Sequence, residues 1–193
     1  MRLAFAALAA LAASLLCSMP AHADDTVILV AKRDMKDQLY GSTVLVVKPV
    51  GSERHVGFIL NKPTQATLGK LFPDHAPSQK IIDPVYLGGP LSSEVIFALV
   101  QRRESPGPRS VRIAPDLFLA IDSEVVDSII EKEAQRARFF AGLVMWRPGE
   151  LDDELKRGLW YVLEDSTDLV MRKPTEGLWE ELVGRSERKA NTI

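Results

Sequence analysis

Residues Phe139–Leu151 read FFAGLVMWRPGEL. The first eight residues are apolar apart from one glycine, which predicts a buried strand that ends at Trp146. Pro148 and Gly149 interrupt the apolar run and favour the start of a short helix, which we expect to end before Gly158. The stretch therefore predicts a buried strand that passes directly into a helix, with the large ring of Trp146 at the junction.

The segment before this strand carries the strongest helical pattern of the chain and predicts a helix over residues 122–138. Asp122 or Ser123 can cap it, and apolar residues from Val125 onward recur at helical spacing on one face. Another amphipathic helix is expected over 175–183, and one or two helical turns over 67–72. The polar tail from Gly184 is expected to fray.

Short runs rich in β-branched or apolar residues predict the remaining strands. They cover residues 26–31, 42–48, 56–60, 85–87, 94–101, 116–121 and 159–163. Pro49–Ser52 is a turn signal, so the second and third of these strands are expected to form an antiparallel hairpin. Because helices interrupt the strands irregularly, the pattern predicts a single compact α+β domain instead of a doubly wound sheet.

The N-terminus has the pattern of a secretory signal peptide, residues 1–23. Met1 and Arg2 give a positive start, residues 3–16 are Ala, Leu and Phe with a single Ser, and Ala21-His22-Ala23 presents small residues for cleavage. We expect a mature chain over 24–193 in the periplasm, without a membrane span. A membrane anchor is the alternative, although the apolar run is shorter than the roughly 20 residues that a bilayer span needs. Without processing, the protein would stay in the cytoplasm.

Composition limits the chemistry of the mature chain. Hydrophobic residues make up 46% and charged residues 26%, which is typical of a globular protein. Cys17 is the only cysteine and lies in the leader, so we expect no disulfide and no thiol chemistry after cleavage. The formal net charge is −2, whereas binding to DNA phosphates needs an excess of Lys and Arg. Direct nucleic-acid binding is therefore not expected.

Sequence motifs of common reactions are missing from the chain. It has no phosphate-binding loop, no G-x-G-x-x-G and no G-x-S-x-G. His55 and His75 are too few for a His-rich metal site, although a mixed site with nearby aspartates is an alternative. Ser92 or Ser93 could act as a nucleophile only with a distant histidine. We therefore expect no metal, no cofactor and no catalytic residues.

Turn-forming residues make up the candidate binding site. They are Asn61 and Pro63 at a predicted strand end, Gly88, Gly89 and Pro90 in one turn, and Trp146, Gly149 and Glu150 at the strand-to-helix junction. If these turns lie at the same end of the sheet, their free amides would form a polar concavity. A purely structural role for the same residues is the alternative.

Taken together, these segments resemble the YqgE/AlgH family. That family shows a G-x-V-L-N-R-P-like strand end, a G-G-P turn and a G-x-x-G-W-x-P-G-Q-L segment. The corresponding stretches here are Gly57–Pro63, Gly88–Pro90 and Gly142–Leu151, and Gly158, Trp160 and Trp179 match a C-terminal element. Met145 and Glu150 stand where the family usually has Gly and Gln. The charge of Glu150 makes anion binding at that junction unfavourable.

The resemblance implies a compact α+β fold in which a small closed or strongly bent, mostly antiparallel sheet is surrounded by helices. It also implies a cytoplasmic protein with the label of a transcriptional regulator, whereas the leader predicts export. We predict a non-catalytic binding or regulatory protein of this family, exported, with an unknown protein or small-molecule partner. A cytoplasmic transcriptional regulator of the same family and a cryptic hydrolase are the two alternatives.

Overall fold

The β-branched runs near the start of the chain form three neighbouring strands in the computed structural model, which describes residues 26–164 and 166–190. β1 (Val27–Ala31), β2 (Val44–Pro49) and β3 (His55–Ile59) are antiparallel, and most of their side chains are buried. The predicted hairpin of β2 and β3 is confirmed, with Leu45 opposite Ile59. The predicted signal peptide lies outside the described residues.

β9 (Ala137–Trp146) is the strand with the most neighbours, and it confirms the strand predicted at 139–146. It runs antiparallel to β3 and to β6 (Leu91–Gln101), and parallel to β5 (Pro84–Leu87). The strand order is β10-β1-β2-β3-β9-β6-β8-β7, and β4 pairs with β5 beside this path. The bounds of the strands not yet given are β4 Pro63–Thr67, β7 Ser110–Ala114, β8 Leu117–Ala120 and β10 Trp160–Glu164.

Helix α2 (Ser123–Lys132) is shorter than the helix predicted over 122–138. The carboxylate of Asp122 caps it by accepting hydrogen bonds from two backbone N–H groups of the first turn. The helix ends at Glu133, where φ is −136°, and a short turn η2 (Ala134–Arg136) leads into β9. The prediction that the helix reaches Arg138 is wrong, because that residue pairs with Leu99 of β6.

The remaining helices are short except for the last one. They are α1 (Leu68–Leu71), the 3₁₀ turn η1 (Ser78–Lys80), α3 (Glu150–Lys156), α4 (Thr167–Met171) and α5 (Leu178–Ala190). β4, β7 and α4 were not predicted, because each mixes polar and apolar residues over only five positions and shows no clear period. The tail expected to fray from Gly184 is helical instead, because α5 continues to Ala190 and its own residues Leu182, Val183 and Ser186 are buried.

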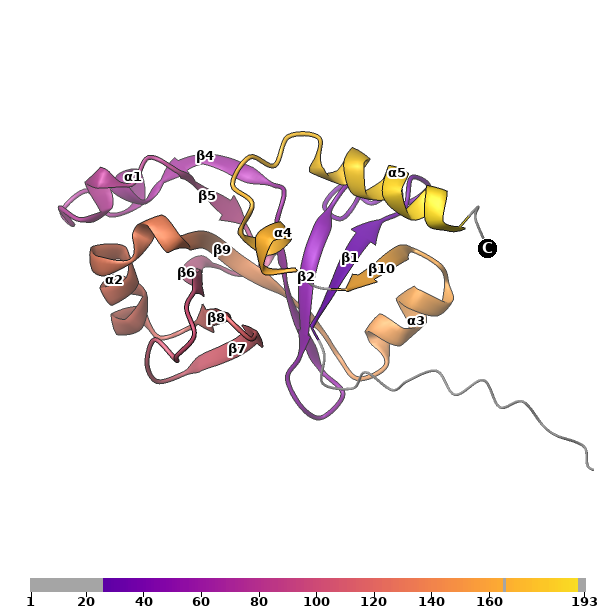
Figure 1. Ribbon diagram of the computed structural model, residues 1–193, viewed down its shortest axis with the longest axis horizontal. Helices are drawn as coiled ribbons and strands as arrows, with labels where there is room; N and C mark the ends of the chain where they lie inside the picture. Colours follow the sequence, from indigo (N-terminus) through magenta and orange to yellow (C-terminus); the bar gives the residue numbers. More distant parts are fainter. Residues whose placement is uncertain (1–25, 165, 191–193) are drawn as a thin grey trace, which may run out of the picture.

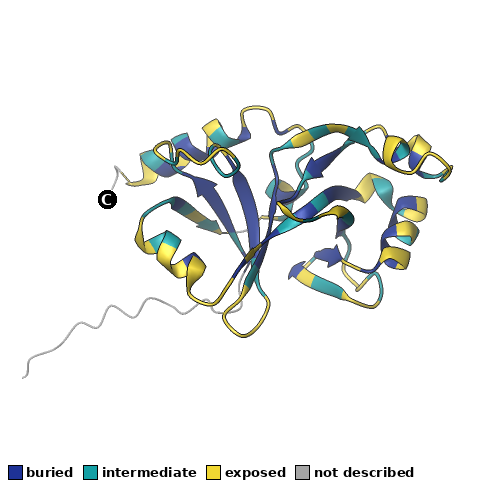
Figure 2. Cartoon of the chain, turned by 180° about the vertical axis from the view of Figure 1, so that it is seen from behind, coloured by how far each residue is buried: buried dark blue, intermediate teal, exposed yellow. Residues whose placement is uncertain are grey.

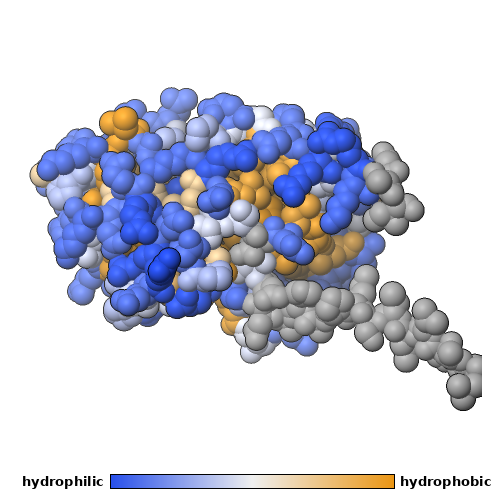
Figure 3. Space-filling view, in the orientation of Figure 1, coloured by the Kyte–Doolittle hydropathy of each residue, from blue (hydrophilic) through white to orange (hydrophobic). Residues whose placement is uncertain are grey.

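Helices cover the curled sheet on more than one side (Figure 1). α4 and α5 bury Val170, Leu178 and Leu182 in the largest core cluster, with side chains of β1, β2 and β3. α2 closes a second cluster with β6 and β8, and α3 closes a third one with Leu151. Figure 2 shows the result, with buried strands inside and helices exposed on their outer faces. In Figure 3, apolar side chains reach the surface beneath α5.

The architecture is a single α+β domain with a strongly curled, mostly antiparallel sheet, as predicted. Core clusters lie on both faces of the sheet, because alternate side chains of β1 belong to different clusters. No helix within 26–164 and 166–190 combines the length and the apolar character needed to cross a bilayer.

Candidate functional site

The register of β3 divides the candidate residues into two groups. Trp146 pairs with His55, the first residue of β3, whereas the carbonyl of Gly88 accepts a hydrogen bond from the N–H of Ile59, the last residue. A five-residue strand is about 16 Å long. The junction at Trp146 and the turn at Gly88 therefore lie at opposite ends of the strand, and the three turns do not meet in one concavity.

The group at the first end of β3 is held by contacts within the fold. Trp146 is 3% exposed, and its indole N–H donates to Glu154 Oε2 at 3.1 Å. Gly149 precedes α3 in the left-handed conformation, with φ of 79°. Glu150 Oε2 accepts a hydrogen bond from the backbone N–H of Arg147 at 2.9 Å. A binding role for this group stays a prediction, since these contacts already account for the residues.

The turn Gly88-Gly89-Pro90 passes unusually close to β9. A Cβ atom on Gly88 would clash with the carbonyl oxygen of Gly142, and one on Gly89 would clash with the backbone of Leu143. The N–H of Gly88 is not free, because it donates to the carbonyl of Ala141 at 2.8 Å. The two glycines therefore allow two backbones to cross in contact.

Asn61 lies just after β3 and its amide holds the neighbouring turn in place. Its Oδ1 accepts from the N–H of Val44 and its Nδ2 donates to the carbonyl of Ser42, both at 2.9 Å. The next residue, Lys62, donates a hydrogen bond from Nζ to the carbonyl of Leu39 at 2.6 Å. Burial lowers the pKa of Lys62, and the negative charge of Asp37 opposes this effect.

A cavity of about 250 Å³ opens where the end of β3 meets the start of α5. We call it the Asn61 cavity, and it is lined by Ser42, Asn61, Pro63, Thr175, Glu176, Gly177, Trp179 and Glu180. Two of the predicted residues, Asn61 and Pro63, are therefore together, while the other six are not among its lining. Its volume is somewhat below the roughly 300–1,000 Å³ typical of drug-sized ligands, so it suits a small group.

The sequence did not predict most of the residues that line the cavity, because they come from two segments that are far apart in the chain. Thr175 to Glu180 are more than a hundred positions from Asn61, and only the tertiary fold places them together. A partial signal existed for Trp179, which matches the C-terminal tryptophan element of the family pattern. Thr175 and Glu176 had no such signal.

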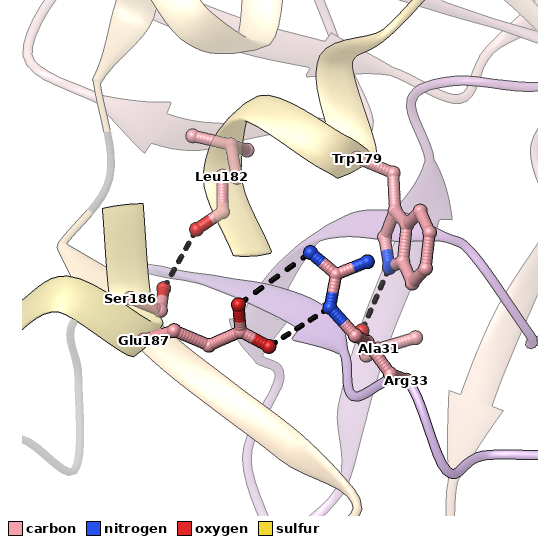
Figure 4. A network of polar contacts seen from close by, with 6 residues as sticks. All are labelled: Ala31, Arg33, Trp179, Leu182, Ser186 and Glu187. Atoms are coloured by element: carbon pink, nitrogen blue, oxygen red, sulfur yellow. Dashed lines mark hydrogen bonds and ion pairs between the residues drawn. The ribbon is translucent and has the colours of Figure 1, made fainter. Parts of the chain in front are cut away.

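Trp179 fixes the start of α5 to the sheet at the edge of the cavity (Figure 4). Its indole N–H donates to the carbonyl of Ala31 in β1 at 2.7 Å. The guanidinium of Arg33 lies 5.5 Å from the ring centroid and donates to Glu187 Oε1 at 2.9 Å. The pKa of Arg33 is raised chiefly by this hydrogen bond and the charge of Glu187, with a smaller contribution from Glu180. The ring of Trp179 therefore already has one cation beside it, and that cation is paired with Glu187.

A second cavity, of about 470 Å³, lies between η1 and the end of α2 and contains none of the predicted site residues. Beside it, His75 Nδ1 lies 2.7 Å from Ser78 Oγ, but Ser78 is fully buried, so a substrate cannot reach its hydroxyl in this conformation. Over the described ranges, neither Ser92 nor Ser93 hydrogen-bonds to a histidine. No group of three or more metal-binding side chains comes together in that same part of the chain.

Comparisons with known proteins agree with the fold and with the motif pattern. A family model described as AlgH-like matches residues 28–191. A UPF0301 protein of Streptomyces coelicolor is 32% identical over 82% of this chain and 84% of its own length. One of Chlorobaculum tepidum is 29% identical, over 81% of this chain and 83% of that protein.

Two solved structures are similar in fold. The solution structure of the AlgH protein from Pseudomonas aeruginosa superposes with a TM-score of 0.69 at 22% identity, covering 82% of this chain and 86% of that one. The crystal structure of a protein from Corynebacterium diphtheriae gives 0.67 at 20% identity, over 84% and 86% of the two chains. At this level of identity the likeness concerns the fold alone.

Proposed function

The chain belongs to the AlgH-like family, and from this premise we propose that it is a non-catalytic binding or regulatory protein. Its ligand is a small molecule, or one side chain of a partner protein, held in the Asn61 cavity. The cavity is too small for a large cofactor. It carries hydroxyl, amide, carboxylate and indole groups, which suit recognition by hydrogen bonds and ring contact.

The observation that carries the proposal is the side chain of Thr175. This residue is 6% exposed and lines the cavity, yet its hydroxyl makes no hydrogen bond to any part of the chain that the structure describes. The hydroxyl oxygen is not among the fully buried polar atoms of the described residues that lack a hydrogen bond, so it is open to the cavity and available to a ligand. A ligand in the cavity can supply the missing hydrogen bond, and the start of α5 is already held in place by Trp179.

Binding can be tested with protein purified from its native cells, against a panel of small cationic, neutral and anionic molecules. We expect at least one class to raise the melting temperature saturably, and Thr175→Val to weaken this effect. Glu131→Gln, in the second cavity, serves as the matched control and should leave it unchanged. Saturable turnover of any panel member, or binding that depends on Glu131 and not on Thr175, would contradict the proposal.

The proposal includes export to the periplasm, on the pattern of residues 1–23. Cell fractionation followed by N-terminal sequencing should find a periplasmic protein that begins at Asp24. An intact Met1 in the cytosol would overturn this part and favour the alternative of a cytoplasmic transcriptional regulator. Activity abolished by replacing both histidines would instead favour the hydrolase.

A further inference from the structure

We infer that the Asn61 cavity selects a compact organic cation, a guanidinium or ammonium group such as the end of an arginine or lysine side chain. This inference rests on the proposed function, because it names the chemical class of the ligand for the same cavity. It comes from the charge of the lining, the hydrogen-bond acceptors left open and the indole at the edge.

The lining carries two carboxylates and no basic side chain. Glu176 and Glu180 both line the cavity, and neither forms an ion pair with another described residue. The neighbouring Glu181 differs, because it accepts from Arg172 at 2.7 Å and does not line the cavity. An anion would meet two negative charges here that have no ion-pair partner within 26–164 and 166–190, whereas a cation would neutralise them.

The start of α5 opposes this preference, but only partly. A helix N-terminus acts as roughly half a positive charge, which favours anions. Glu180 and Glu181 lie in the first turn of α5, and Glu176 lies just before it. Glu181 is paired with Arg172, but the carboxylates of Glu176 and Glu180 have no ion-pair partner in the described part of the chain, and these two charges outweigh half a positive charge. Arg33 does not reverse this balance, because its charge is paired with Glu187.

The open hydrogen-bonding positions also suit a donor-rich ligand. The Thr175 hydroxyl has no partner among the residues described, and Asn61 Oδ1 uses one of two lone pairs for the N–H of Val44. Guanidinium and ammonium groups offer several N–H donors and no acceptor. The ring of Trp179 adds a surface on which cations lie favourably, as Arg33 already does at 5.5 Å from its centroid.

The test compares three blocked amino acids of similar size, using the native protein and tryptophan fluorescence or calorimetry. The cation is Nα-acetyl-arginine amide, the neutral isostere is Nα-acetyl-citrulline amide, and the anion is Nα-acetyl-glutamate amide. We expect saturable binding of the cation, about tenfold tighter than that of the neutral isostere, and no binding of the anion. Nα-acetyl-lysine amide should bind as well.

Substitutions of the two carboxylates then test whether they cause the preference for cations. Glu176→Gln and Glu180→Gln should each weaken cation binding about threefold, and the effect should shrink at high salt. Glu181→Gln is the matched control on the same helix and should leave binding unchanged. Equal binding of citrulline and arginine derivatives, preference for the anion, or no binding of the arginine derivative would each overturn the inference.

The two proposals fail in different ways. If the anion or the neutral probe binds best and Thr175→Val abolishes that binding, the cavity is a ligand site but its selectivity for cations is refuted. If no member of the wider panel binds at the cavity, the proposed function fails together with this inference.

Discussion

The indole N–H of Trp146 donates a hydrogen bond to Glu154 Oε2, 3.1 Å away across the β9–α3 junction. The indole of Trp160 donates to the same oxygen at 2.8 Å. One carboxylate oxygen thus ties β9, α3 and β10 together beneath a buried core cluster. The arrangement makes Trp146 part of the core, at the far end of β3 from the Asn61 cavity.

Trp146→Ala should therefore lower the free energy of unfolding by about 3–5 kcal/mol, because it leaves a large cavity and removes one hydrogen bond. Trp146→Phe keeps most of the packing and should cost clearly less. Urea unfolding of both variants measures the difference. A small loss for Trp146→Ala, with ligand binding impaired first, would contradict the core role.

Because the backbones cross in contact at Gly88, we expect a single added methyl group at this residue to lower the free energy of unfolding strongly. Gly88→Ala places a Cβ against the carbonyl oxygen of Gly142, so the backbones must move apart, at a cost of about 3 kcal/mol or more. Gly184→Ala is the matched control within α5, where the nearest atom outside the helix backbone is the end of the flexible Arg188 side chain. The control should gain about 0.5–1 kcal/mol in helix stability. Thermal unfolding that shows similar changes for both variants would refute the close crossing.

Arg138 is a buried cation that joins three parts of the fold. It is 2% exposed and donates to the carbonyls of Leu60 and Val170 at 2.6 and 2.5 Å, with its guanidinium 4.1 Å from the ring of Tyr86. Burial lowers its pKa to about 10, although the neighbouring Tyr86 and Asp83 favour the charged form.

Arg138→Met should lower stability by about 1–3 kcal/mol, since two carbonyls lose their partner while the cost of burying a charge is relieved. α4 should lose hydrogen-exchange protection before the central strands, because Val170 belongs to it. Unchanged or higher stability would show that the cost of burying the charge is the larger effect.

The hydrogen bonds to Asp116 predict that the free energy of unfolding depends on pH in acid. Its pKa is lowered, first by the hydrogen bond from the Thr167 hydroxyl at 2.6 Å and next by that from Gln101 at 3.0 Å. A carboxyl whose folded pKa is below the ordinary 3.8 stabilises the fold above that pH and loses the contribution as pH falls through the lowered value. Asp116→Asn should therefore flatten the fall in unfolding free energy below pH 3.8. A slope equal to that of the wild type in acid denaturation would contradict this.

Asn61 should affect stability as well as binding, which is why it is not used as a binding variant. Asn61→Ala removes the partners of the Val44 N–H and the Ser42 carbonyl, and should cost about 1–3 kcal/mol. Amide exchange at Val44 should accelerate more than at other residues of β2. Normal protection at Val44 would show that the side chain does not hold this turn.

Local patterns in the sequence were enough for much of the fold. The β-branched runs of β1, β2 and β3, the turn between β2 and β3, and the amphipathic face of α2 all predict their structures, because each depends on neighbouring residues. The motif pattern also identified the family. The short elements β4, β7 and α4 were not predicted, because each mixes polar and apolar residues over only five positions and shows no clear period.

The sequence by itself determined most of the strands, the family and the residues that form the turns. Only the tertiary structure decided that Trp146 and Asn61 lie at opposite ends of β3, and that Asn61 meets Thr175 and Trp179. The reason is physical. Strand register and helix docking are set by contacts between residues far apart in the chain, and a local sequence pattern does not show which of these distant residues come into contact. The Asn61 cavity exists because of that long-range packing.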